Sequence, residues 1–251
     1  MPTPQPPTAP LTHAAPPRLR ELLEELTPEL AARGFTAHAG HPLWARPTEH
    51  GLLTAVLSYA PDDDEGGWVE AFAGLVDERV ETQVAGLMGR AATHGPFRHT
   101  VLAGSTRWPG AKLYRQPVHS PADGLEAANL LLRWWSLALP ELAWRFGDAP
   151  APVSGDDDAA ARGTDADPAA GLLEEQRSIQ RLDALFNAAH PFAPALLTHE
   201  LYRALRGVTV RAVAAPEGLT EAYDFHRARM QATGFWDVYG EQVRAQLLRL
   251  S

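Results

Sequence analysis

Residues 148–170 contain one large apolar side chain, that of Val153, in 23 positions. Six acidic groups and one basic group give the stretch a net charge of −5. A segment of this kind buries too little apolar surface to offset the conformational entropy that is lost on ordering. We therefore expect a flexible acidic linker that separates an N-terminal domain, residues 18–147, from a C-terminal region, residues 171–251.

The first 17 residues contain seven prolines and almost no large apolar side chains. Proline fixes φ and removes a hydrogen-bond donor, so we expect residues 1–17 to be a disordered tail. The segment has no positively charged start followed by an apolar run, and it is therefore not read as a secretory signal. A cytoplasmic location is the resulting expectation.

Hydrophobic periodicity in the N-terminal domain changes from a helical to a strand pattern and back. Leucines at helical spacing predict a helix over residues 18–33, and Gly34 is placed to end it. Alternating apolar residues predict a hairpin from strands 35–46 and 52–59, a third strand over 68–76, and short strands at 100–103 and 111–118. A long helix is expected over 122–146, kinked or divided at Pro140. The pattern indicates an α+β domain, an antiparallel sheet packed by helices.

The C-terminal region is expected to be mainly helical. Apolar residues at helical spacing predict helices that end before Pro191, over 194–205, over 220–233 and over 236–250. The valines of residues 207–215 fit either a strand or a connection between helices.

Residues 18–147 resemble the DUF4304 family, small bacterial domains of unassigned function. The resemblance rests on the leucine-rich first helix that ends in Ala32-Arg33-Gly34-Phe35, and on the strands around Trp44 and Leu52–Tyr59. The closing helix Ala127–Arg145, with its Trp134-Trp135 pair, also fits. The resemblance implies an antiparallel sheet backed by helices and brings no catalytic residues.

Composition excludes several classes of function. The sequence has no cysteine, so disulfides, thiolate metal sites and cysteine nucleophiles are excluded. The formal net charge is −9 and neither flanking part is basic, which disfavours binding to nucleic acid. No apolar run reaches the roughly 20 residues that a membrane span needs. Phosphate-loop, dinucleotide-binding and nucleophile-elbow motifs are absent, and we expect no cofactor.

One alternative is a hydrolase-like enzyme with a histidine–carboxylate or metal site in the N-terminal domain. Its candidates are His94, His99 or His119, acting with Glu70 or Asp77. The spacing does not select a working set, because zinc needs three or four converging ligands.

The leading hypothesis is a non-enzymatic module that binds another protein through aromatic and arginine side chains. Trp108 precedes Pro109-Gly110, a turn that would expose its indole beside Arg107 and Arg115. Trp134 on the long helix and Trp236 in the C-terminal region are further candidate anchors. Another alternative is an immunity- or antitoxin-like binder, since a small acidic protein suits a basic toxin.

Overall fold

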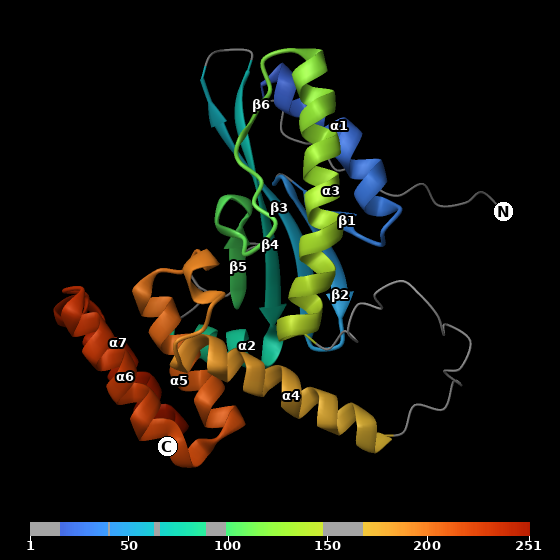
Figure 1. The fold of residues 1–251 in the computed structure, drawn as a ribbon. Helices are drawn as coiled ribbons and strands as arrows, with labels where there is room; N and C mark the ends of the chain where they lie inside the picture. The colour runs from blue at the N-terminus through green and yellow to red at the C-terminus, as the bar shows by residue number, and fades with distance from the viewer. Residues whose placement is uncertain (1–15, 40, 63–65, 89–98, 148–167) are drawn as a thin grey trace.

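The computed structural model describes residues 16–39, 41–62, 66–88, 99–147 and 168–251 (Figure 1). Residues 1–15 of the expected tail, residues 148–167 of the expected linker, and His94 lie outside the described residues. Two expected boundaries are corrected. Pro17 starts the first helix, and Pro168 starts a helix inside the segment assigned to the linker. Proline is favoured in a first helical turn because the amide hydrogen that it lacks has no partner there.

Helix α1, Pro17–Ala31, has the leucine face that the sequence predicts. Its five leucines, Leu19, Leu22, Leu23, Leu26 and Leu30, are all buried. The helix continues through Pro28, and the hydroxyl of Thr27 donates to the carbonyl of Leu23 at 2.7 Å. Gly34 follows with φ +81°, the left-handed conformation expected of a residue that ends a helix.

The antiparallel sheet has the strand order β1-β2-β3-β4-β5. The short strand β6 also pairs with β4, at Trp68 and Val69 near its start, while β5 pairs with Phe72–Leu75. The strands are β1 Thr36–Ala37, β2 Leu43–Thr48, β3 Gly51–Pro61, β4 Gly67–Asp77, β5 Val101–Gly104 and β6 Gln116–Pro117. The hairpin is confirmed, with Thr48 opposite Gly51 across the turn.

Two strands differ from the expectation. The strand predicted over 35–46 is divided into β1 and β2. The His38 amide donates to the Leu43 carbonyl at 2.8 Å, and Pro42 donates no ladder hydrogen bond. The strand predicted over 111–118 shrinks to Gln116–Pro117. The segment before it turns back, and the Leu113 amide donates to the Ser105 carbonyl at 3.1 Å.

Helix α3, Pro121–Phe146, is stabilised at its start by a reciprocal capping box between Ser120 and Asp123. It runs unbroken past Pro140, so the expected division there is wrong. Pro140 lies on the exposed side of the helix, where the carbonyl that loses its partner faces water. Its buried neighbours Leu139 and Leu142 keep the helix packed on the sheet.

The C-terminal region is helical, as predicted, but its internal boundaries differ. It consists of α4 Pro168–Asn187, η3 Ala193–Ala195, α5 Glu200–Ala214, η4 Pro216–Gly218, α6 Leu219–Ala232 and α7 Trp236–Leu250. The helix expected over 194–205 starts later, at Glu200, and it continues through the valine-rich residues 207–214. Burial of Val208 and Val210 outweighs the strand propensity of valine.

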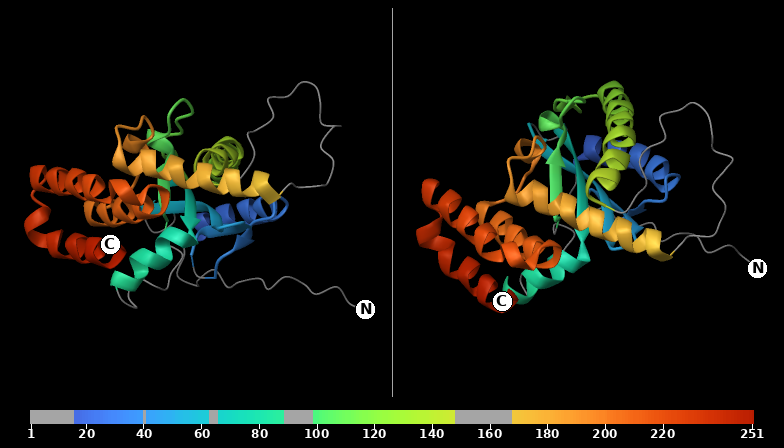
Figure 2. Two further views of the ribbon diagram at one scale, coloured as in Figure 1. Left: turned by 90° about the horizontal axis from the view of Figure 1, so that it is seen from below. Right: turned by 60° about the horizontal axis from the view of Figure 1, so that its bottom comes forward.

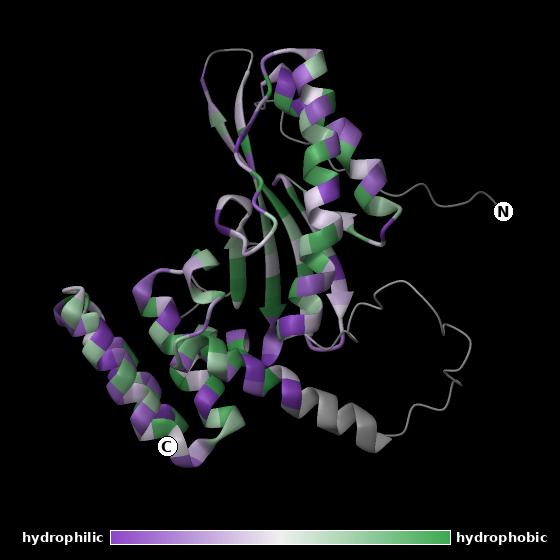
Figure 3. Cartoon of the chain, viewed as in Figure 1, coloured by the Kyte–Doolittle hydropathy of each residue, from purple (hydrophilic) through white to green (hydrophobic). Residues whose placement is uncertain are grey.

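Helices α1 and α3 cover one face of the sheet (Figures 1 and 2). Trp44 of β2 contacts both: its indole nitrogen donates to the Thr27 hydroxyl at 3.2 Å, and its ring meets that of Trp135 edge-on. In Figure 3 the central strands are the most hydrophobic elements in view. Every second residue of the strands points toward α1 and α3. In β3 these residues are Leu53, Ala55, Leu57 and Tyr59.

The C-terminal helices pack at one end of the sheet and share its hydrophobic core. The amide of Leu197 donates to the carbonyl of Leu102 in β5 at 2.8 Å, and Leu196 forms a bridge with Ala103. The two parts of the chain therefore build one continuous core. In the described part of the chain, none of the helices is both long enough and apolar enough to cross a bilayer.

A buried ion pair also joins the two parts. Helix α2, Glu78–Met88, contributes Glu81, whose carboxylate accepts two hydrogen bonds from Arg206 of α5, at 2.7 and 3.1 Å. These side chains are only 6% and 8% exposed. Thr100 donates to the same carboxylate at 2.9 Å. A paired and hydrogen-bonded arrangement of this kind is what makes buried charge tolerable.

Candidate functional site

The face of the sheet opposite α1 and α3 carries a hollow of about 570 Å³. Glu70 and Phe72 of β4 point into it because they alternate with Ala71 and Ala73, which face the core. Ser58 lies opposite Glu70 on β3. We call this region the sheet-face hollow; its lining is Ser58, Glu70, Phe72, Gly104, Thr106, Arg107, Tyr114, Arg115 and Leu197.

Glu70 organises the interior of the sheet-face hollow. One carboxylate oxygen accepts a hydrogen bond from the Thr106 hydroxyl at 2.8 Å, and the other accepts one from Arg115 Nε at 3.1 Å. Arg115 remains 62% exposed. The pair therefore anchors one nitrogen of the guanidinium while much of the side chain faces solvent.

The rim carries a second cation without a counter-charge. Arg107 ends the short helix η2, Ser105–Arg107, and is exposed. Its guanidinium makes no hydrogen bond and no ion pair to any residue that the structure describes. Tyr114 is 70% exposed beside it, and Leu197 is partly exposed across the hollow.

The structure brings Arg107 and Arg115 together, as predicted, but it moves Trp108 away from them. Trp108 is 0% exposed, so the expected exposed indole in this turn is wrong. Its ring packs edge-on against Trp134 and Phe192. The indole N–H donates to Glu141 of α3 at 3.1 Å. A buried indole gains a large apolar contact area, and that contact outweighs the turn signal of Pro109-Gly110.

The other two tryptophans proposed as anchors also pack inward. Trp134 is buried, and its indole nitrogen donates to the Ala111 carbonyl at 2.9 Å. Trp236 is half-buried at the start of α7, where its ring packs edge-on against Tyr223 of α6. Among the described residues the large exposed aromatic side chains are instead Trp68, Tyr114 and Phe225.

The histidines and carboxylates proposed for a hydrolase-like enzyme do not come together in one site. His99 is buried and pairs through Nε2 with the Thr54 hydroxyl at 2.7 Å. His119 lies edge-on to Trp68, with Asp62 at 3.9 Å.

The carboxylates of that alternative have structural partners. Asp77 accepts from the backbone nitrogen and the guanidinium of Arg79 at the start of α2, while Glu70 belongs to the sheet-face hollow. Among the described residues no three histidine or carboxylate groups are placed to share a metal ion.

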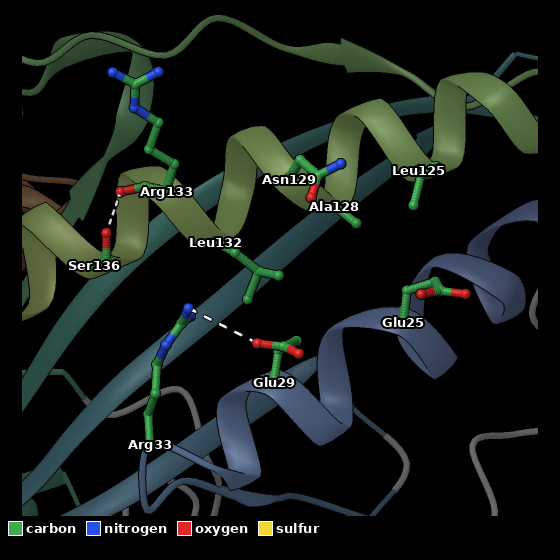
Figure 4. Close-up of a pocket in the computed structure, with 9 residues that line it drawn as sticks. All are labelled: Glu25, Glu29, Arg33, Leu125, Ala128, Asn129, Leu132, Arg133 and Ser136. Carbon is green, nitrogen blue, oxygen red and sulfur yellow. Dashed lines mark hydrogen bonds and ion pairs between the residues drawn. The ribbon is translucent and has the colours of Figure 1, made fainter.

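A second hollow, of about 530 Å³, lies between α1 and α3 (Figure 4). Its α1 side carries Glu25, Glu29 and Arg33, and its α3 side carries Leu125, Asn129 and Leu132 among others. Figure 4 shows Arg33 directed toward Glu29, while Arg133 points away from α1. In this groove Arg33 and Glu29 form an exposed ion pair at 4.0 Å, and the lining contains no histidine beside its carboxylates.

In comparisons with known proteins, no family model, no curated sequence and no solved structure matches this chain. The resemblance of residues 18–147 to the DUF4304 family therefore stays a prediction from sequence.

Sequence reasoning missed two features of the sheet-face hollow. One is the hydrogen bond between Thr106 and Glu70, and the other is Tyr114 as its exposed aromatic residue. The signal for Glu70 was present: it alternates with apolar residues in a strand whose other face is fully buried. The contribution of Thr106 had no such signal, because the loop after β5 reaches Glu70 only in the folded chain.

Proposed function

We propose that this chain is a protein-interaction module whose binding surface is the sheet-face hollow. The observation that supports this proposal is Arg107, an exposed cation that has no counter-charge among the described residues, at the rim of a concave surface with exposed apolar neighbours. We infer that the partner contributes an acidic side chain that pairs with Arg107.

The residue types around the hollow support this proposal. Arginine and aromatic residues are enriched at the centres of protein interfaces, where water is excluded and charge pairing is strengthened. Tyr114 supplies a rigid amphipathic ring, and Arg115 is already oriented by Glu70, so it loses less side-chain entropy when a partner binds. No chemical step is required of this surface.

Charge supports a protein partner over nucleic acid. The whole chain has a formal net charge of −9, so it repels a phosphate backbone except near local cations. Two arginines, one of them paired with Glu70, form too small a positive area for the many phosphate contacts that such binding uses. They are sufficient to select one acidic side chain on a protein.

The test is site-specific photo-crosslinking. A photo-reactive amino acid replaces Tyr114, and in a control protein it replaces Leu248, which is highly exposed on α7. Both proteins are irradiated in extract from the source cells. We expect a discrete cross-linked product from position 114 that position 248 does not give.

Charge reversal then tests the proposed pairing. Arg107→Glu is expected to lower the yield of the 114 product by about tenfold or more, because attraction becomes repulsion. Arg133→Glu, on the exposed side of α3, is the matched control and should leave the yield unchanged. Equal yields from Arg107→Glu and the unaltered protein would contradict the proposal.

A further inference from the structure

A second group of charged side chains lies between α5 and α6, apart from the sheet-face hollow. It comprises Glu200 and Arg203 from the first turns of α5, and His226 and Arg229 from α6. Burial and mutual electrostatic influence link the four groups. The proposed protein-interaction surface does not use any of them.

The carboxylate of Glu200 is fully committed to one of the two arginines. Arg229 donates to its two oxygens from Nε at 2.8 Å and from an Nη at 2.9 Å. This bidentate pairing lowers the pKa of Glu200 and raises that of Arg229. The pair is therefore ionised and leaves no net charge.

Arg203 is the surplus cation of the group. It is only 8% exposed, and its Nε is buried without a hydrogen-bond partner. No carboxylate among the described residues lies within ion-pair distance of its guanidinium. Burial and the nearby Arg229 lower the pKa of Arg203, and the Glu200 carboxylate offsets part of this effect. An arginine side chain nevertheless stays charged in proteins.

The four groups together keep one excess positive charge, because the single carboxylate, Glu200, faces two arginines. Burial, together with Arg203 and Arg229, lowers the pKa of His226 to about 3, so the imidazole is neutral near pH 7. The first turn of α5 adds the partial positive charge of a helix N-terminus. Buried guanidinium groups in native proteins are paired, and one that lacks a partner among the residues the structure describes has room for one from outside.

We propose that Arg203, at the N-terminal turn of α5, forms a binding site for a small oxyanion, a phosphate or carboxylate group. One bound monoanion would neutralise the surplus charge, and its oxygens would accept the unused guanidinium hydrogens. The Leu201 amide of this turn already donates to His199 Nδ1 at 3.2 Å, so the guanidinium of Arg203 is the group that would hold the anion. Inorganic phosphate and acetate, used as separate probes, distinguish a phosphate source from a carboxylate source.

The test is thermal unfolding of the full chain in increasing phosphate or acetate, against sodium chloride at equal ionic strength. A ligand that binds only the folded state raises the melting temperature in a saturable way. At about 100 times the dissociation constant the rise for a chain of this size is on the order of 5 °C. A response to both oxyanions no larger than the response to chloride would overturn the proposal.

Substitution of Arg203 tests whether this side chain binds the anion or only contacts water. In chloride alone, Arg203→Met should melt at or above the unaltered protein, because it removes an unpaired buried charge. In saturating oxyanion the order should reverse, since only the unaltered protein is stabilised. Arg227→Met, which removes an exposed ion pair with Asp224 on the same helix, is the control and should keep the full response.

Calorimetric titration of the unaltered protein with phosphate or acetate keeps the test independent of any variant's folding. We expect one site per chain. An Arg203→Met protein that retains the oxyanion response would show that the anion binds elsewhere and would overturn the assignment. Neither outcome depends on cross-linking at the sheet-face hollow.

Discussion

At the scale of single residues, burial decides the role of several polar and aromatic side chains. Trp108 and Trp134 become core residues with satisfied indole nitrogens, although a turn suggested exposure of Trp108 and both were candidate anchors for a partner. His226 is buried with Nε2 bonded to Asn187 Oδ1 at 2.8 Å. Gly207 permits this approach, because a Cβ there would lie 2.0 Å from the same ring nitrogen.

The buried His226 predicts a specific loss of stability in mild acid. Its pKa is about 3 in the folded chain, against 6.5 as the ordinary value, so only the unfolded chain takes up the proton between these limits. Stability therefore falls as the pH drops below 6.5. Between pH 7.5 and pH 5 this residue should contribute a loss of about 2 kcal/mol.

Urea unfolding of His226→Gln measures that contribution. The variant is less stable at neutral pH, but the pH-dependent part of its free energy of unfolding should be about 2 kcal/mol smaller than in the unaltered protein. His38→Gln, at an exposed histidine after β1, is the control for replacing a histidine elsewhere in the chain. Parallel curves for His226→Gln and the unaltered protein would refute the prediction.

At the scale of elements, packing partners set boundaries that local propensity alone leaves open. α3 continues through Pro140 because its buried side is continuous, and α5 takes in valines that fit a strand equally well. The opening helix, the hairpin and the C-terminal helices are confirmed because each has a strong period of its own. β1 and β6 were misjudged because their pairing depends on neighbouring strands.

The contact between α2 and α5 depends on the buried Glu81–Arg206 pair. Arg206→Met should lower the free energy of unfolding by about 3–5 kcal/mol, because Glu81 is left as an unpaired buried charge. Replacing both residues with Met should cost less than the single change. Urea denaturation measures both.

Arg211 provides a matched comparison within α5. Its ion pair with Asp183 is more exposed, so Arg211→Met should cost clearly less than Arg206→Met. Equal losses for the two variants would show that burial of the Glu81–Arg206 pair has no special effect.

At the scale of the whole molecule, the chain folds around one core, although an acidic stretch divides its sequence into two parts. Arg79 of α2 donates to Ser178 of α4, and Arg181 of α4 donates to the carbonyl of Trp144 in α3. The N-terminal sheet and the C-terminal helices therefore stabilise each other through polar as well as apolar contacts.

This shared core predicts that a single cut between the two parts leaves the protein assembled. A protease site introduced at residues 155–158 and then cleaved should give two fragments that co-elute in gel filtration as one particle. In concentrated urea the fragments should elute separately. Separate elution in native buffer would mean that the shared core is too weak to hold them together.

The amino-acid sequence by itself determined the α+β class, the helices with a strong apolar period and the β2–β3 hairpin, because these depend on contacts near in the chain. It also predicted that Arg107 and Arg115 lie beside the same turn, at Pro109-Gly110. Only the tertiary structure decided that Trp108 is buried, that Glu70 holds Arg115, and that Arg203 lies buried with no ion-pair partner in the described part of the chain. Those outcomes depend on contacts between distant segments, and no local pattern of residue types encodes which side chain a remote segment covers.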